Sequence, residues 1–221
     1  MRVVLKLGGR VAGQAARQAT HLRAAGEEVV VVHGAGPQIT AELERLGLEA
    51  RFVDGRRVTT PAVLEVVRAS LAAVNAEVCA ALGPVAQGLM GDEIGLVAEP
   101  VAALGLVGDP VPCAPAAVLD ALAARRVPVV APLATGPLNV NADEAAAALA
   151  VGLGAQRILF VSDVPGVLVD DAVAAQLGAD EATAMLDAGR FEGGIVPKLV
   201  AAIRAARGGV RAEIGATAVV A

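Results

Sequence analysis

The sequence contains no tryptophan and no tyrosine, and its only aromatic residues are Phe52, Phe160 and Phe191. Since 56% of its 221 residues are nevertheless hydrophobic, we expect an aliphatic core large enough for one domain or two small lobes. The two cysteines, Cys79 and Cys113, share no spacing motif, which is typical of small core residues in a reducing cytoplasm. These absences exclude the small domains that depend on disulfides or structural metals.

Positive charge and long apolar runs are also scarce. The chain has 18 basic and 23 acidic residues and a net charge of -5, which argues against nucleic acid as a partner. No stretch reaches the roughly 18 to 20 uninterrupted apolar residues of a membrane span. Met1 leads almost directly into an apolar strand rather than into a secretory leader. We therefore expect a cytoplasmic protein without a membrane partner.

Lysine is the rarest basic residue. Sixteen of the 18 basic residues are arginine, and only Lys6 and Lys198 are lysine. A compact, flexible ammonium does things that a planar guanidinium cannot, so the two lysines are candidate functional residues. The count alone does not distinguish a functional role from chance, so the positions of the two lysines in the sequence must decide between them.

The N-terminal residues repeat one pattern of strand, glycine turn and helix. Arg2–Leu7 runs into Gly8 and Gly9, and Glu28–His33 runs into Gly34–Gly36, each followed by a helical pattern. Such alternation predicts an α/β fold with a mainly parallel sheet whose apolar strands are buried on both faces. Further helices are expected at about 61–82, 115–125, 143–153, 180–188 and 194–207, strands at about 127–132, 156–162 and near the C-terminus, and a hairpin turn at Asp54-Gly55.

The two glycine turns predict a ligand site. In an open parallel sheet, ligands bind beyond the carboxyl ends of the strands, and glycines let an anion approach the backbone N–H groups. Strand-to-helix turns need glycine in any case, so neither turn decides alone. No complete P-loop or dinucleotide fingerprint is present.

The lysines both lie beside such turns. Lys6 ends the first strand, two residues before Gly8, and Lys198 falls in the first turn of a helix after Gly193-Gly194. A lysine there opposes the helix dipole but suits a bound phosphate. Their location therefore favours function over chance.

Polar residues alternate in Leu138–Asp143. In an extended segment Asn139, Asn141 and Asp143 share one face, although Asn and Asp also commonly cap helices. The turn at Asp163–Gly166 carries no function by itself. His33 is interpreted as a packed turn residue rather than a base.

Taken in order, these segments resemble the amino acid kinase family and, within it, the acetylglutamate kinase branch. The segments are Lys6–Gly9, His33–Gly36, Arg57–Thr59, Asn139–Asp143, Ser162–Val167 and Gly193–Lys198. The resemblance covers nearly the whole chain. It implies a three-layer αβα sandwich of the carbamate kinase-like type, with an N-lobe of about residues 1–138 for the amino acid and a C-lobe of about 139–221 for the nucleotide.

The resemblance also implies roles for individual residues. Lys6 and Lys198 would stabilise the transferring phosphoryl group, Asp143 would orient them, and Gly8 and Gly9 would bind phosphate. The substrate would be held by Gly34, Ala35, Gly36, Arg57 and Asn139. The nucleotide would be held by Ser162, Asp163, Val164, Pro165, Gly166, Val167 and Leu168. No protein metal site is implied, because Mg²⁺ would be held mainly by the phosphates of ATP.

The implied reaction is phosphorylation of the γ-carboxylate of N-acetyl-L-glutamate by ATP, in arginine biosynthesis. The chain is shorter than typical members and lacks the N-terminal extension of arginine-inhibited hexamers, so we expect a homodimer without that inhibition. Two alternatives stay open: a sister kinase acting on aminoadipate or glutamate linked to a carrier protein, and a non-catalytic amino-acid-binding regulatory module.

Overall fold

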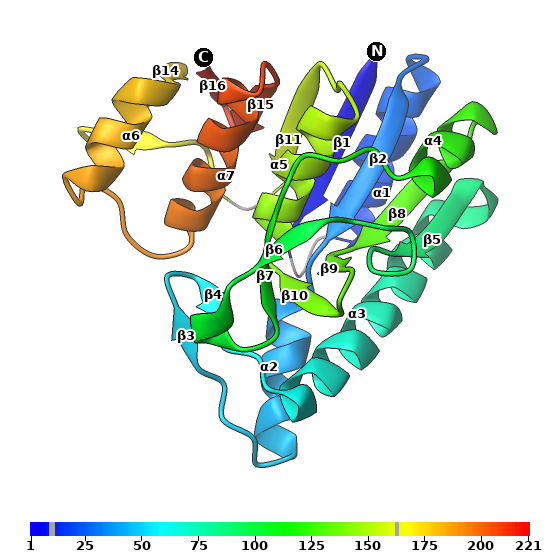
Figure 1. The fold of residues 1–221 in the computed structure, drawn as a ribbon. Coiled ribbons are helices and arrows are strands. Elements are labelled where there is room, and N and C mark those ends of the chain that lie inside the picture. Colours follow the sequence, from blue (N-terminus) through cyan, green and yellow to red (C-terminus); the bar gives the residue numbers. More distant parts are fainter. Residues whose placement is uncertain (9–11, 162–163) are drawn as a thin grey trace.

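A mainly parallel eight-stranded sheet runs through the protein (Figure 1). The computed structural model describes residues 1–8, 12–161 and 164–221. In spatial order the strands are β14 (Gln176–Gly178), β16 (Thr217–Val220), β15 (Arg211–Ile214), β11 (Arg157–Val161), β1 (Arg2–Leu7), β2 (Glu28–His33), β8 (Val127–Ala131) and β5 (Ala86–Met90). Among the described strands of this sheet, only β15 and β16 pair in antiparallel fashion. The sequence predicted a single short strand here, and the hairpin β15–β16 corrects that expectation.

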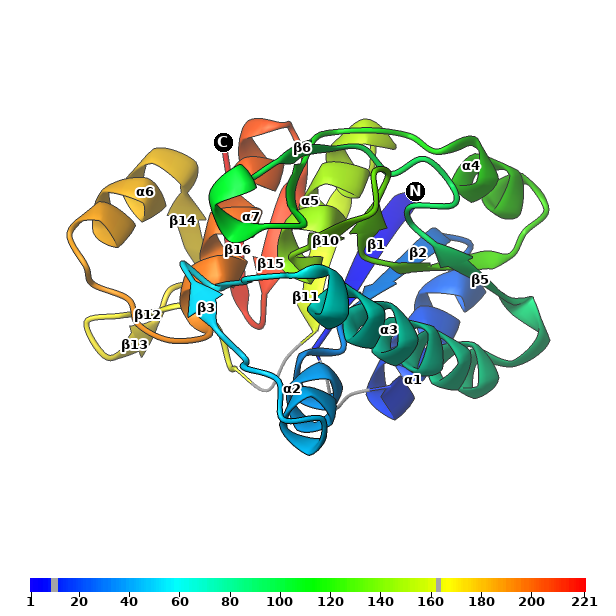
Figure 2. The same cartoon turned by 60° about the horizontal axis from the view of Figure 1, so that its bottom comes forward.

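Helices cover both faces of the sheet (Figures 1 and 2). The helices are α1 (Ala12–Ala24), α2 (Gly36–Arg45), α3 (Pro61–Leu82), α4 (Ala116–Ala123), α5 (Ala142–Gly152), α6 (Ala179–Asp187) and α7 (Ile195–Arg207), with short 3-10 turns at Gly83–Val85 and Ala102–Leu104. Successive side chains of β1 point to opposite faces, so Val3 and Leu5 pack in the cluster with α1 and α3. Val4 packs in the cluster with α5 and α7. The predicted three-layer α/β architecture is confirmed.

Helix α3 is long and apolar enough to cross a membrane by length and composition, alone among the described helices. Thr60 caps it by accepting a hydrogen bond from the Val63 N–H (3.3 Å), and Pro61 starts its first turn, as predicted. Its apolar side chains pack against β5, β8, α1 and α2. One face of α3 is therefore part of the protein core.

Smaller sheets accompany the eight-stranded sheet (Figures 1 and 2). One has four strands in the order β6 (Ala98–Pro100), β7 (Val107–Pro110), β10 (Leu138–Val140) and β9 (Leu133–Ala134). Two hairpins join β3 (Phe52–Val53) to β4 (Arg56–Arg57) and β12 (Leu168–Val169) to β13 (Ala172–Val173). Asp54 and Gly55 turn the first hairpin with positive φ angles of 48° and 75°, at the turn that the sequence predicted.

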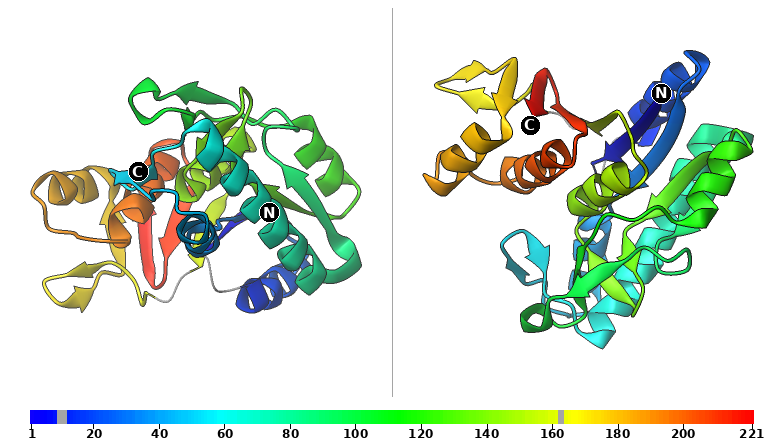
Figure 3. Two further views of the ribbon diagram at one scale, coloured as in Figure 1. Left: turned by 90° about the horizontal axis from the view of Figure 1, so that it is seen from below. Right: turned by 45° about the horizontal axis from the view of Figure 1, so that its top comes forward.

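The C-terminal elements extend one end of the sheet. Figure 3 shows α6, α7 and strands β14–β16 on one side of β1, and β5 at the far side. Both chain termini lie at the same end of the molecule, opposite α2 (Figure 1). The carboxyl ends of β1 and β2 therefore face α2 and the hairpin β3–β4, where the candidate site lies.

Candidate active site

A cavity of about 270 Å³ lies at the carboxyl ends of β1 and β2. We call it the lysine cavity. It gathers nine of the residues proposed from the sequence: Lys6, Gly8, Gly34, Ala35, Gly36, Arg57, Asn139, Asp143 and Lys198. These residues come from both ends of the chain and from its middle. The expectation that the two lysines converge on one site therefore agrees with the geometry.

Lys6 and Asp143 form a buried ion pair in this cavity. The distance from Lys6 Nζ to Asp143 Oδ1 is 2.8 Å, and the side chains are only 7% and 9% exposed. Lys6 projects from β1 toward α5, because it has the same parity along the strand as Val4. The first turn of α5 thus presents its carboxylate directly to the strand.

Lys198 approaches the same carboxylate from α7. Burial lowers the pKa of Lys198, the nearby charge of Asp143 opposes this lowering, and Lys6 adds to it. The Lys198 ammonium also donates to the carbonyl oxygen of Gly194 (3.3 Å) at the start of α7. The Asp143 carboxylate therefore pairs directly with Lys6, and its charge also acts on the Lys198 ammonium.

The glycine turns line the cavity wall. Helix α2 starts at Gly36, and its N-cap residue, Ala35, provides no side-chain cap. Because Ala35 and Gly36 line the cavity, the positive end of the helix dipole faces it. The Gly8 N–H donates to the carbonyl oxygen of Val161 (3.1 Å), so this donor is already used in the structure. Gly9, the other proposed phosphate-binding residue, lies outside the described residues.

Arg57 points into the cavity from the hairpin β3–β4. Its Nη2 donates to Thr40 Oγ1 (2.9 Å) and to the Gly36 carbonyl oxygen (3.4 Å), and its guanidinium lies 4.4 Å from the centre of the Phe52 ring. Its Nη1 is buried and finds no hydrogen-bond partner among the described residues. Burial lowers the pKa of Arg57. An unpartnered guanidinium nitrogen suits a ligand carboxylate.

Asn139 is held next to Arg57 through a buried threonine. Asn139 Nδ2 donates to Thr59 Oγ1 (3.0 Å), and that hydroxyl donates to the Arg57 carbonyl oxygen (2.7 Å). Thr59 is completely buried. This chain of hydrogen bonds explains why Arg57 and Thr59 occur two residues apart.

The polar segment around Asn141 differs from its predicted extended form. Strand β10 ends at Val140, and Asn141 caps α5 by accepting hydrogen bonds from the N–H groups of Asp143 (2.8 Å) and Glu144 (3.3 Å). Asp143 is therefore helical, and the shared extended face was wrong. Asn139, Asn141 and Asp143 still line the same cavity, because the strand and the helix both meet it.

The described members of the proposed nucleotide set, residues 164–168, do not line the lysine cavity. Ser162 and Asp163 are outside the described residues. Val167 is buried and its N–H donates to Thr217 Oγ1 (2.8 Å), which ties this segment to the start of β16. Leu168 lines a separate hollow of about 380 Å³ with Phe191. Val164, Pro165 and Gly166 line neither of these two cavities.

His33 is a packed residue, as interpreted from the sequence. It is 1% exposed, and Asn75 Nδ2 donates to its Nε2 (3.0 Å). Burial lowers the pKa of His33 to about 4. The imidazole is therefore uncharged at neutral pH, which does not suit a role as a charged group.

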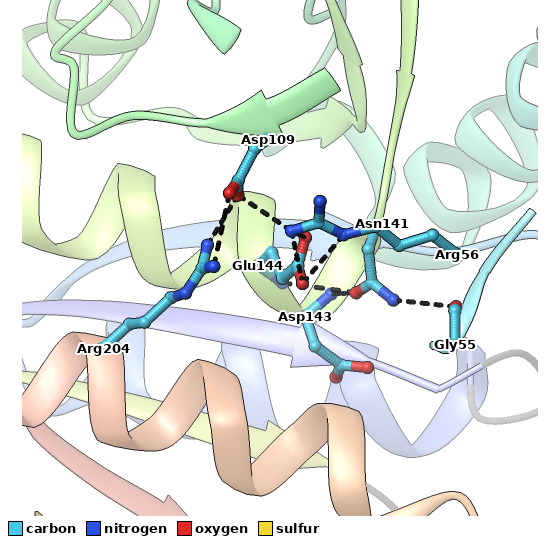
Figure 4. Close-up of polar contacts among 7 residues, drawn as sticks. All are labelled: Gly55, Arg56, Asp109, Asn141, Asp143, Glu144 and Arg204. Atoms are coloured by element: carbon cyan, nitrogen blue, oxygen red, sulfur yellow. Dashed lines mark hydrogen bonds and ion pairs between the residues drawn. The ribbon is translucent and has the colours of Figure 1, made fainter. Parts of the chain in front are cut away.

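A second polar cluster, which we call the arginine network, adjoins the lysine cavity (Figure 4). It consists of Arg56, Asp109, Glu144 and Arg204. No sequence motif marks this cluster. The available signals were that Arg56 precedes Arg57 and Glu144 follows Asp143, but the pairing spans 88 residues and depends on the fold.

The sequence is similar to those of known proteins. The model of the amino acid kinase family matches residues 1–215. The chain belongs to the amino acid kinase family. The acetylglutamate kinase of Saccharopolyspora erythraea is 42% identical over 235 residues, covering 94% of this chain and 77% of that protein. Membership of this family implies that the chain is a kinase that uses ATP.

Solved structures support the same fold. A crystal structure from Streptococcus mutans UA159 superposes with a TM-score of 0.89 at 27% identity, covering 99% of this chain and 98% of that one. The carbamate kinase of Giardia lamblia bound to AMP-PNP superposes with a TM-score of 0.73 at 17% identity, with coverage of 99% and 98%. The second likeness shows the fold alone, and it agrees with the carbamate kinase-like sandwich expected from the sequence.

Proposed function

We propose that this chain transfers the γ-phosphoryl group of ATP to the γ-carboxylate of N-acetyl-L-glutamate, in arginine biosynthesis. One observation carries the proposal: Lys6, Arg57 and Lys198 line the lysine cavity, where Asp143 is the single carboxylate among the residues that the structure describes. The fourth cation at its edge, Arg56, is paired with Glu144 and Asp109. An excess of buried positive charge in a chain of net charge -5 favours an anionic ligand.

The proposed chemistry needs no general base. A side-chain carboxylate has a pKa of about 4.3 and is already ionised at neutral pH. One of its oxygens attacks the γ-phosphorus, the bond to the β-phosphate oxygen breaks, and ADP leaves with its electron pair. The barrier is the approach of two anions, so fixed positive charge at the transferring group is the main catalytic requirement.

The lysines fit this requirement. We assign Lys6 and Lys198 to the transferring phosphoryl group and Asp143 to holding both ammonium groups in place. A compact ammonium on a flexible stem can follow the phosphoryl group between two oxygens. Gly8 and Gly9 are assigned to the phosphates.

The substrate side is assigned to Arg57, Asn139 and the turn Gly34–Gly36. The unpartnered Arg57 Nη1 and the uncapped start of α2 both suit a carboxylate or an amide oxygen. The acetylglutamate kinases at about 40% identity support N-acetyl-L-glutamate as the substrate.

The nucleotide is assigned to the C-lobe, about residues 139–221, with Ser162–Leu168 at its base, and the amino acid to the N-lobe, about residues 1–138. Mg²⁺ would be held mainly by the nucleotide phosphates. The proposed setting is the cytoplasm, and the proposed assembly is a homodimer. Light scattering that gives the mass of a hexamer would contradict the dimer.

The carrier-linked alternative requires a basic rim around the substrate mouth for an acidic carrier protein. Arg56 and Arg57 are turned inward and engaged, and only Arg51 of this trio is exposed. Exposed Glu49 and Asp54 lie near it in the sequence. This charge pattern favours a free small-molecule substrate.

An ADP-release assay tests the proposal. Free N-acetyl-L-glutamate is compared with glutamate, aspartate and carbamate in the presence of MgATP, and turnover is expected to be fastest with N-acetyl-L-glutamate. Turnover only with an acyl group on a carrier protein would favour the sister kinase. Calorimetry that detects amino acid binding without MgATP binding would favour the regulatory module.

A further inference from the structure

The hairpin β3–β4 depends on its side chains for its position. Each strand has two residues, and the hairpin forms a sheet of its own that joins no other strand among the described residues. One backbone bond, from the Val58 N–H to the Arg51 carbonyl oxygen (3.0 Å), closes its base. An isolated two-stranded hairpin is marginally stable at best. Contacts to the rest of the protein must therefore hold it in place.

Arg56 provides the strongest of these contacts (Figure 4). Its Nη2 lies 2.9 Å from Glu144 Oε2 and 3.0 Å from Glu144 Oε1, and its Nε donates to Oε1 at 3.3 Å. The same Nη2 lies 3.0 Å from Asp109 Oδ1. The Arg56 and Glu144 side chains are 15% and 8% exposed. The guanidinium thus fixes the hairpin to α5 and β7 at once.

The network continues from β7 to α7. Arg204 Nη1 donates to Asp109 Oδ1 (2.6 Å) and Nη2 donates to Oδ2 (3.3 Å). Asp109 therefore bridges two arginines, one on the hairpin and one on the helix that also carries Lys198. The hairpin is tied to the same helix as the candidate catalytic lysine.

Two pairs of sequence neighbours divide their roles in this region. Adjacent residues of a strand point to opposite sides: Arg57 extends into the lysine cavity, while Arg56 borders the cavity and makes its ion pairs in the network. In the first turn of α5, Asp143 meets Lys6 while Glu144 meets Arg56. One member of each pair lies at the reacting centre, and its neighbour lies in the network.

We propose that Glu144 and Arg56 are positioning residues that hold the hairpin over the lysine cavity and thereby set Arg57 for the carboxylate of the amino acid substrate. This inference rests on the proposed function for its kinetic effect. Neither residue needs to touch substrate. Loss of the pair would weaken substrate binding equally in the ground state and in the transition state, so KM would change and kcat would not.

The position of Glu144 explains why the pair is sensitive. A buried carboxylate that loses its cation is left uncompensated, which costs far more than loss of an exposed pair. Burial raises the pKa of Glu144, although the charge and hydrogen bonds of Arg56 oppose the rise. Arg56 therefore compensates the buried charge of Glu144, and Glu144 in turn holds the hairpin through Arg56.

Kinetics of Glu144→Gln, Arg56→Gln and the double variant provide the first test. In the ADP-release assay, each single variant is expected to raise KM for N-acetyl-L-glutamate about tenfold, with KM for ATP and kcat within about twofold. The double variant is expected to match a single variant, because both changes break one contact. Asp109→Asn, at the more exposed end of the network, is expected to raise KM for N-acetyl-L-glutamate about threefold. This variant replaces Glu144→Gln as the test if Glu144→Gln does not fold.

Arg207→Gln is the matched control. Arg207 also lies on α7 and pairs with a carboxylate, Asp180 (2.9 Å), but on the surface and away from the hairpin. Its kinetic constants are expected to equal those of the unchanged protein. A fall in kcat at constant KM in Glu144→Gln would instead mean that Glu144 acts through its neighbour Asp143. Additive effects in the double variant, or an unchanged KM in folded single variants, would overturn the proposal.

Amide hydrogen exchange of residues 52–58 separates this inference from the proposed function. The experiment needs no substrate, and the exchange is expected to be about tenfold faster in Glu144→Gln while that of β1 stays the same. If the protein shows no turnover with N-acetyl-L-glutamate but the hairpin still opens in the variant, the proposed function fails and the positioning role remains. Equal exchange in the two proteins would refute the positioning role whatever the substrate is.

Discussion

The lysine cavity and the arginine network start on the same turn of α5 and differ in their balance of charge. In the network, the two guanidinium groups of Arg56 and Arg204 meet the two carboxylates of Asp109 and Glu144. Among the described residues that line the cavity, the cations Lys6, Arg57 and Lys198 accompany a single carboxylate, Asp143, while Arg56 at its edge belongs to the network. A balanced cluster satisfies itself, whereas an unbalanced buried cluster costs stability that an anionic ligand can offset. The difference therefore separates the proposed reacting centre from the structure that positions it.

The arginine network and the lysine cavity also differ in the type of cation that they contain. The network uses arginine, whose planar fork engages two carboxylates in a fixed geometry. The cavity uses both lysines of the chain, whose rotatable ammonium groups suit a group that moves during the reaction. Exchange of one cation for the other should consequently damage the two regions to different extents.

The largest effect is expected from Lys6→Arg and Lys198→Arg. Each keeps its charge but loses the compact shape, and kcat is expected to fall on the order of 10² to 10³, as for loss of one transition-state donor. The reciprocal change, Arg204→Lys, is expected to alter kcat by less than about threefold, because Arg204 holds Asp109 and lines no part of the lysine cavity. Steady-state kinetics of the three variants measure this, and near-normal kcat in both lysine variants would remove the roles assigned to them.

The next effect concerns His33, a buried neutral group directly before the turn Gly34–Gly36. Its pKa is about 4 in the folded protein against an ordinary 6.5, so the unfolded chain binds more protons between these values. Stability is therefore complete above pH 6.5 and is lost as the pH falls toward 4, by about 3 kcal/mol from this residue. Protonation would add a positive charge next to a turn that lines a cavity already rich in cations.

Urea unfolding between pH 6.5 and pH 4 checks this expectation. His33→Gln should lose about 3 kcal/mol less than the unchanged protein over this interval, because it carries no titrating group there. His21→Gln is the matched control, since His21 is the other histidine and is exposed. Parallel loss of stability in all three proteins would show that His33 does not titrate in this interval.

Local signals explain how far the sequence predicted the fold. Strands β1 and β2 have the predicted bounds, because an unbroken apolar run followed by glycine has few other solutions. The start of α3 follows from Thr60 and Pro61, which act within one turn. The parallel order of β1 and β2 then places Gly8 and Gly34 at one edge, so much of the candidate site followed from the sequence.

Contacts between distant segments explain the rest. Arg56 meets Glu144 across 88 residues, and nothing next to either residue indicates the other. The sequence around Asn141 is compatible both with an extended strand and with the start of a helix. Packing of α5 against β1 and β11 favours the helix, which Asn141 caps. Alternation along a strand predicts faces only as far as the strand continues, and β10 ends at Val140.

The smallest effect is expected where an arginine pair lies on the surface. Arg207 and Asp180 are 53% and 97% exposed, so solvent screens their contact, and Arg207→Gln is expected to lower the free energy of unfolding by about 1 kcal/mol or less. Arg56→Gln makes the same chemical change where the partner carboxylate is 8% exposed, and it is expected to cost about 3 kcal/mol because Glu144 would remain buried without its cation. Urea unfolding at neutral pH measures both variants. Equal losses would mean that burial does not distinguish the network from a surface pair, and the division between a balanced positioning cluster and a cationic cavity would then lose its energetic basis.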